Sequence, residues 1–236
     1  MAVHKLRGGD LARPRLVSDD TILDATRQVL AELGPLKLTL AAVGARVGLA
    51  PPTLMQRFGS KRGLLLASAA RSPLMVKLAA EEAAGRNASP LATLRDFALS
   101  AVAHIKHREE LGNGLGFVQL DVADPEFRQH ALAHSAAIVD SCDTLYTAAV
   151  EVGELRADTD VPALARHTLV CFNGALQVWA VNGWGSLTEF LTEQLDLMIG
   201  PYLRSDGVSA RPGLLPGHDG LQRDPERAAD SGRPES

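Results

Sequence analysis

The sequence contains little that favours a β-sheet, an extracellular setting or a membrane. Only 4% of its 236 residues are aromatic, and only Cys142 and Cys171 are cysteines. Two thiols do not make the disulfide framework of a small secreted domain, so a reducing cytoplasm is the simpler expectation. No apolar run approaches the roughly 20 residues that span a bilayer. The basic N-terminus is not followed by the apolar core of a secretory signal. We therefore expect a cytoplasmic protein with no membrane segment.

Charge is distributed unevenly along the chain. The net charge is −4, but residues 1–71 hold 11 of the 24 Lys and Arg residues and only 5 of the 28 Asp and Glu residues. The N-terminal part is therefore +6 and the remainder is −10. A basic end on an acidic body is typical of a protein that meets a polyanion, although a basic segment can also serve only solubility.

The patterning predicts an all-α protein. Alanine and leucine are abundant, and both lose little freedom in a helix. No segment alternates apolar and polar residues with β-branched enrichment, so we expect no sheet. Apolar stripes, N-cap residues and Gly or Pro breaks predict helices at residues 22–33, 40–47, 51–58, 62–84, 90–107, 109–120, 125–152, 161–181 and 187–203.

Composition divides the chain into four parts. Residues 1–17 read as a flexible basic arm, in which Arg13 and Arg15 are equally compatible with a DNA contact and with no role. Residues 18–62 hold three short helices, and residues 63–203 hold the longer ones. Residues 204–236 are rich in Gly, Pro, Arg, Asp and Ser, and we expect them to be disordered because they cannot bury enough apolar surface to order themselves.

The second and third short helices are joined by the tight turn Gly48-Leu49-Ala50, as in a helix-turn-helix. In that motif the first helix of the pair braces the DNA backbone and the second lies in the major groove. Gly48 supplies the positive φ that the turn needs. Small residues such as Gly44 fit where the two helices touch.

This part of the chain resembles the DNA-binding domain of tetracycline-repressor (TetR) type regulators. The resemblance lies in the run from Thr39 to Leu64, TLAAVGARVGLAPPTLMQRFGSKRGL, and in the preceding helix that begins at Ile22. It covers about 45 residues, and the rest agrees only in helical layout. It implies an N-terminal helix-turn-helix domain and a C-terminal helical bundle that senses a ligand and dimerises.

The resemblance also implies roles for individual residues. Thr39, Thr53 and Lys61 match positions that hold DNA phosphates. The other candidate DNA-binding residues, which lie near bases or backbone, are Pro51, Pro52, Met55, Gln56 and Arg57. Gln can read adenine and Arg can read guanine, each through two hydrogen bonds. The family usually has Tyr at the place of Met55 and often His at the place of Arg57. The paired prolines remove two N–H groups that might otherwise hold phosphate.

For the C-terminal body the resemblance implies a homodimer and a pocket for a small-molecule effector. The candidate dimerising element is the pair of helices at residues 161–181 and 187–203, which would form a four-helix bundle with their mates. On the last helix one apolar face is the candidate dimer interface, with the alternative that it packs only within the subunit: Leu187, Phe190, Leu191, Leu195 and Met198. Candidate effector-binding residues are the aromatic side chains of the body, each of which could equally be core: Phe97, Phe117, Phe127, Tyr146, Phe172 and Trp179.

No catalytic site, metal or cofactor is expected. The chain has no nucleophile motif and no Gly-rich loop after a strand. The pairs His104/His107 and His130/His134 have helical spacing, but no carboxylate or thiol completes a metal-ligand set. Neither cysteine has a basic sequence neighbour that would lower its pKa. The sequence therefore predicts a regulator of transcription, most simply a repressor that binds a near-palindromic DNA site. The alternatives are an all-α enzyme and a helical adaptor that binds protein.

Overall fold

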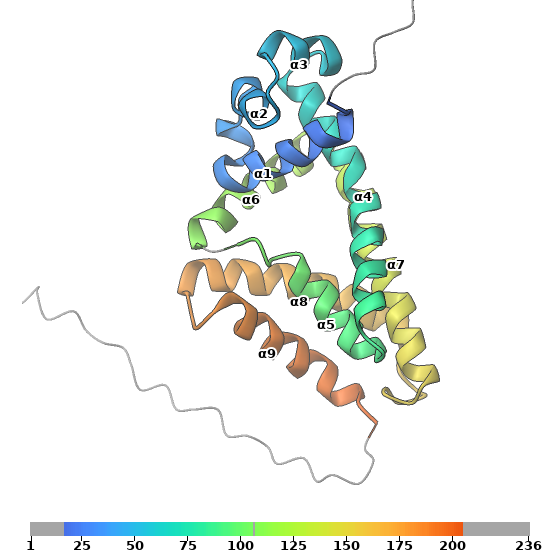
Figure 1. Cartoon of the computed structure of the whole chain (residues 1–236). Helices are drawn as coiled ribbons and strands as arrows, with labels where there is room; N and C mark the ends of the chain where they lie inside the picture. The colour runs from blue at the N-terminus through green and yellow to red at the C-terminus, as the bar shows by residue number, and fades with distance from the viewer. Residues whose placement is uncertain (1–16, 106, 205–236) are drawn as a thin grey trace, which may run out of the picture. The chain divides into compact units, whose positions relative to one another are not determined.

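The computed structural model describes residues 17–105 and 107–204, without the side chains of residues 109 and 112–118. The predicted basic arm, apart from its last residue Val17, and the predicted disordered tail, apart from Arg204, lie outside the described residues. The described part is helical (Figure 1) and contains α1 (Asp19–Lys37), α2 (Leu40–Val47), α3 (Pro51–Phe58), α4 (Lys61–Arg86), α5 (Pro90–Ser100), α6 (Arg108–Ala123), α7 (Pro125–Glu151), α8 (Val161–Asn182) and α9 (Leu187–Ile199).

The ends of the first three helices follow from their sequence. Ser18 and Thr39 cap α1 and α2 by accepting hydrogen bonds from backbone N–H groups three residues further on. Gly34 has a φ of 72° and breaks the helical path of α1 before Pro35. Gly48 ends α2 with a left-handed φ of 68°. The predicted bounds of α2 and α3 are confirmed residue for residue.

Five predicted helix ends are wrong. α1 continues past the break at Gly34 to Lys37 rather than ending at 33, and α6 continues to Ala123 rather than ending at 120. Gly85 does not close α4, which continues to Arg86 and ends where Asn87 becomes extended. The helix predicted to reach residue 107 ends at Ser100, after which i→i+3 hydrogen bonds replace the helical ladder, as from the Val102 amide to the Leu99 carbonyl. The last helix ends at Ile199 rather than 203, and a short 3-10 turn over Gly200–Tyr202 follows it.

The described residues contain no strand, as predicted. One isolated antiparallel bridge joins Leu155 to Leu203. The Arg156 amide donates to the Tyr202 carbonyl at 2.9 Å, which ties the loop between α7 and α8 to the end of the described chain.

The described helices share three apolar cores. The first holds the helix-turn-helix together through side chains such as Ile22, Leu38 and Leu54, and it also contains Phe127 from α7. The second joins α4, α5, α7 and α8 around Tyr146. The third joins α8 and α9 around Trp179 and Leu191. Because Phe127 of α7 belongs to the first core, the three N-terminal helices pack directly on the body. The domain boundary predicted at residue 62 therefore stays a prediction.

α4 connects the helix-turn-helix to the body and lies alongside α7 (Figure 1). It is the one described helix long and apolar enough to cross a membrane by length and composition. It contacts α1, α3, α5 and α7 in this fold, and 17% of its most apolar stretch is buried.

Candidate nucleic-acid interface

The turn between α2 and α3 depends on two glycines. The Leu49 amide donates to the Gly44 carbonyl at 2.9 Å, which folds the chain back after α2. A Cβ atom on Gly44 would lie 2.3 Å from the Leu49 carbonyl oxygen, closer than packed atoms allow. Gly48 supplies the left-handed turn residue. The angle between the two helices is therefore fixed by backbone contact.

One face of α3 is exposed and the other is anchored. Leu54 is fully buried in the first core, whereas Pro51, Pro52, Gln56 and Met55 are exposed. The remaining candidates for DNA contact on this surface are Thr53, which is half-buried, and Thr39, which is exposed at the start of α2. We call this set of six residues the α3 surface. Five of them lie on α3 and Thr39 is the N-cap of α2, and their contact with DNA stays a prediction.

The start of α3 offers few backbone donors. Pro51 and Pro52 have no N–H group, and the Thr53 amide already donates to the Ala50 carbonyl at 3.0 Å. A phosphate held at a helix N-terminus needs free N–H groups pointing outward. Side chains are therefore the groups with which α3 can contact a nucleic acid.

Arg57 does not belong to the exposed surface. Its guanidinium donates to the Val17 carbonyl at 2.8 Å and lies 3.0 Å from the Asp19 carboxylate. Its side chain is only 9% exposed. Because its charge and some of its donors are already engaged inside the protein, a contact of Arg57 with DNA would compete with these bonds and stays a prediction.

Other cations near α3 also have partners within the chain. The Lys61 ammonium donates to the Leu36 carbonyl at 2.8 Å, and its side chain is half-buried. Arg46 forms an ion pair with Glu32. A phosphate contact by Lys61 would therefore compete with a bond that it already makes.

Arg62 connects the start of α4 to the junction of α6 and α7. It pairs with Asp124 at 2.8 Å and with Glu126, and its guanidinium lies 5.7 Å from the centre of the Phe127 ring. The hydrogen bond from Arg62 lowers the pKa of the Asp124 carboxyl below its ordinary value. This contact ties the helix that follows α3 to the body.

Sequence reasoning missed Lys37. It is exposed in the last turn before α2, two residues ahead of Thr39, and it has no hydrogen bond or ion pair with any other described residue. The signal that could have identified Lys37 is its place in the sequence, just before the helix whose N-cap, Thr39, is expected to contact a DNA phosphate. Lys37 is free to meet a phosphate in a way that Arg57 is not.

The aromatic residues predicted to line an effector pocket do not come together. Phe97 and Tyr146 lie in the second core, Phe127 lies in the first, and Phe172 and Trp179 lie in or against the third. The side chain of Phe117 is outside the part that the structure describes. Burial in separate cores explains these five positions as packing rather than as one site.

A cavity of about 400 Å³ lies elsewhere, between α1, α4, α6 and α7. We call it the junction cavity, because α1 belongs to the helix-turn-helix and the other three helices to the body. None of the five described aromatic candidates lines it. The described lining residues are Leu23, Asp24, Arg27, Leu30, Ala31, Ser68, Ala69, Arg71, Ser72, Met75, His104, Ile105, Glu110, Leu111, Asp121, His130, Ala131 and His134.

The apolar face predicted for dimer contact on α9 points inward. Leu187, Leu191 and Leu195 are buried within the chain, and Phe190 and Met198 are half-buried against its cores. The first three are core residues because they close α9 onto α8 and α5. An interface on α9 would have to use its other face.

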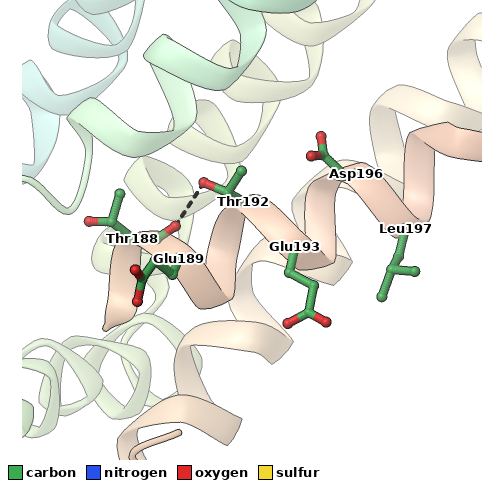
Figure 2. Close-up of a pocket in the computed structure, with 6 residues that line it drawn as sticks. All are labelled: Thr188, Glu189, Thr192, Glu193, Asp196 and Leu197. Atoms are coloured by element: carbon green, nitrogen blue, oxygen red, sulfur yellow. Dashed lines mark hydrogen bonds between the residues drawn. The ribbon is translucent and has the colours of Figure 1, made fainter. Parts of the chain in front are cut away.

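That outer face of α9 is polar. Figure 2 shows a surface hollow whose lining comes from this one helix, from Thr188 to Leu197. Glu189 belongs to the capping box with Ser186, and Asp196 pairs with Arg95 at 2.7 Å. Because its carboxylates are largely engaged in the chain's own contacts and one helix cannot enclose a ligand, we assign no site to it.

The histidines and cysteines do not form a metal or redox centre in the described chain. No three His, Cys, Asp or Glu side chains among the described residues are placed to hold a metal ion. Burial raises the pKa of the Cys142 thiol to about 12, and burial also raises that of Cys171. His134 bonds to Ser72 through Nδ1 at 2.7 Å.

Comparisons with known proteins agree with this geometry. Residues 22–68 match the family model of bacterial regulatory proteins of the tetR family. A putative TetR-family transcriptional regulator from Rhodococcus sp. has a similar structure, with 21% identity, a TM-score of 0.61, and coverage of 78% of this chain and 97% of that one. SmeT, the repressor of the Stenotrophomonas maltophilia multidrug efflux pump SmeDEF, has 24% identity and a TM-score of 0.59, over 86% of this chain and 97% of its own. No curated protein matches the sequence.

The resemblance to TetR-type transcriptional regulators is therefore confirmed in two ways. The sequence matches the family over α1, α2, α3 and the start of α4. The described chain has the fold of TetR-family regulators, with an N-terminal helix-turn-helix and a helical C-terminal part.

Proposed function

We propose that this protein is a non-enzymatic, ligand-responsive repressor of transcription that binds a near-palindromic DNA site as a homodimer in the cytoplasm. The observation that carries the proposal is the geometry of α3. A short helix is held by one buried leucine and a fixed turn, and it presents Gln56 and Met55 outward. The family match covers the same segment. A helix displayed in this way fits the major groove.

Within this proposal the exposed residues divide into two roles. Gln56 is the side chain with two hydrogen-bonding groups suited to a base edge, adenine above all. Thr39, Thr53 and Lys37 carry groups suited to phosphate, and Lys37 would release counterions on binding. Lys61 joins them only if it leaves the Leu36 carbonyl.

One recognition helix gives little affinity, so the proposal requires a second subunit. α8 has an exposed apolar stripe that fits this role. Val170, Val178 and Val181 lie on one side of the helix and are 70%, 42% and 79% exposed, and Trp184 follows at 55%. Apolar side chains in such a row favour contact with an equivalent row in a two-fold dimer. We propose the α8 stripe as the dimer interface in place of the buried leucines of α9.

Response to a small molecule is the third element. SmeT has been solved in a complex with triclosan, at 22% identity and a TM-score of 0.59 to this chain, over 84% of this chain and 97% of that one. The junction cavity gives this chain room for a molecule in contact with both α1 and the body. An effector that fits only one position of the helix-turn-helix would shift the population away from the DNA-binding form.

Selection of bound fragments from random duplex DNA tests the proposal. The full chain should enrich a two-fold symmetric sequence whose half-sites lie about 10 base pairs apart, or a multiple of that spacing. The Gln56→Ala variant should lose preference at one position in each half-site. Failure to enrich any duplex, with the chain folded and dimeric, would leave a protein-binding adaptor as the better interpretation.

A further inference from the structure

The junction cavity has a chemistry that the effector proposal leaves open. Its described walls are formed in large part by apolar side chains from all four helices and from the segment before α6, listed here: Leu23, Leu30, Ala31, Ala69, Met75, Ile105, Leu111 and Ala131. A volume of about 400 Å³ lies within the range of small-molecule sites. Such walls favour an occupant that is mainly hydrocarbon.

The charged groups on these walls are not equivalent. Arg71 is neutralised by Asp24 at 2.7 Å and by Asp20 at 3.4 Å. Burial lowers the pKa of the His104 imidazole, and the positive charge of Arg27 lowers it further. Glu110 acts on the same imidazole in the opposite direction. Arg71 is therefore neutralised within the chain, whereas Arg27 is exposed and forms no ion pair or hydrogen bond with another described residue.

Among the described acidic residues of these walls, Asp121 is the exception. Its carboxylate is half-buried on the cavity wall and forms no ion pair or hydrogen bond with any other described residue. Burial raises its pKa above the ordinary value. Asp121 lies 11 residues from Glu110 on α6, which is about 16 Å along a helix, so the two carboxylates line opposite ends of the α6 wall. A carboxylate in an apolar surrounding is unfavourable until a cation joins it.

We propose that the junction cavity binds a hydrophobic monocation whose positive centre pairs with the Asp121 carboxylate and whose hydrocarbon part fills the apolar walls. This inference rests on the proposed function and deepens it, because it names the chemical class of the effector and its place. Organic anions and neutral molecules of the same size cannot form an ion pair with the Asp121 carboxylate.

The position of the cavity explains how an occupant would act on DNA binding. One wall is α1, which shares the first core with α2 and α3, and the opposite walls are α6 and α7. Asp24 and Arg71, which join α1 to α4, also line the cavity. An occupant would therefore contact the helix-turn-helix and the body at once and change how α1 packs against α4, α6 and α7.

Calorimetric titration of the purified full chain tests the proposal with three probes that share a phenylbutyl group. Phenylbutyltrimethylammonium is the cation, phenylbutanol the neutral probe and phenylbutyrate the anion. The cation should bind at least about tenfold more tightly than either of the other two. Asp121→Asn should remove that preference and leave phenylbutanol binding unchanged. Asp140→Asn, an exposed carboxylate on α7, is the matched control and should keep the preference.

A second pair of variants tests the place independently of the charge. Ala131→Phe fills the cavity from α7 and should weaken both the cation and phenylbutanol. Ala133→Phe adds the same ring to an exposed position of the same helix and should change neither. This pair decides the matter if Asp121→Asn does not fold, as circular dichroism would show.

The outcomes separate this inference from the proposed function. Equal binding of the three probes, no binding of the cation, or a cation affinity untouched by Asp121→Asn or by Ala131→Phe overturns the cation site. Duplex selection is a separate measurement. Duplex enrichment without Asp121-dependent cation binding leaves the regulator and removes the site. Asp121-dependent binding without duplex enrichment keeps the site and removes the regulator.

Discussion

The guanidinium of Arg57 lies 3.0 Å from the carboxylate of Asp19, so the third helix is tied to the first turn of the first helix. The same guanidinium holds the Val17 carbonyl at 2.8 Å. A cation at the end of a recognition helix would ordinarily be assigned to DNA. Here its charge is directed into the protein, and we infer that it helps to orient α3.

Replacing Arg57 should therefore reduce stability before it reduces DNA recognition. Arg57→Ala should lower the free energy of unfolding by about 1 kcal/mol, because a largely buried hydrogen-bonded group is lost. Gln56→Ala, its exposed neighbour, should leave stability within about 0.5 kcal/mol of the parent. Urea unfolding followed by circular dichroism measures both. Equal stability of the two variants would contradict an internal role for Arg57.

Gly44 is a position in the helix-turn-helix that tolerates little change. A methyl group there meets the Leu49 carbonyl oxygen at 2.3 Å, and backbone atoms cannot move aside cheaply. Gly44→Ala should cost about 2 kcal/mol of stability, measured by thermal unfolding. Gly85→Ala is the matched control, since a Cβ there meets nothing within 4 Å and the site is helical. It should stabilise the protein by about 0.5 kcal/mol. A neutral Gly44→Ala would show that the turn can adjust.

These two positions also mark what the sequence could and could not predict. The roles of Gly44 and Gly48 can be predicted from the local sequence, since a helix-turn-helix needs small or flexible residues at fixed offsets. The α2 and α3 bounds were predictable for the same reason. Arg57 was not, because its partners Val17 and Asp19 are about 40 residues away and no local pattern shows them.

The oligomeric state should depend on the α8 stripe. Val181→Glu places a charge at a 79% exposed valine that we assign to the dimer interface. It should shift the protein from dimer to monomer in sedimentation velocity, because an unpaired charge opposes burial. Val152→Glu, at a 63% exposed valine outside the stripe, should leave the dimer intact. Dissociation in both variants, or in neither, would remove α8 as the interface.

Stability should fall in mild acid through His134. Burial lowers the pKa of its imidazole below the ordinary 6.5. Below about pH 6.5 the imidazole is protonated in the unfolded chain but still neutral in the folded chain. The free energy of unfolding therefore decreases as the pH falls toward the pKa of the folded state. His104 shares this direction, through burial and then Arg27.

The His134→Gln variant should therefore lose less stability than the parent between about pH 7.5 and about pH 5.5 in urea unfolding. His167→Gln, at an exposed position on α8, should lose as much as the parent. An unchanged loss in His134→Gln would mean that other groups dominate the acid response.

The body illustrates the limit of sequence reasoning more sharply than the helix-turn-helix. Phe97, Phe127 and Trp179 were reasonable candidates for a pocket, since aromatic side chains line many sites. Each packs in a different core, because contacts between helices decide burial and no period in the sequence encodes them. The leucines of α9 were correctly placed on one face, but which partner that face meets depends on the tertiary fold. The junction cavity needs four helices to exist and had no local signature.

Lys37 should contribute charge rather than sequence preference. Lys37→Ala should weaken binding to all duplexes alike and reduce the salt slope by about one per subunit, because one phosphate contact is lost. Gln56→Ala should instead weaken only the selected duplex, by about tenfold, and keep the slope. Identical behaviour of the two variants would contradict the separate roles assigned to them.

The most direct measurement is the affinity of the full chain for its selected duplex across a series of salt concentrations, with a scrambled duplex beside it. An α3 surface seated in two successive grooves predicts a steep linear fall of log affinity with log salt for both duplexes, and a selected duplex bound at least about a thousandfold more tightly than the scrambled one. A flat dependence on salt, or equal affinity for the two duplexes, would contradict the central claim that α3 reads DNA.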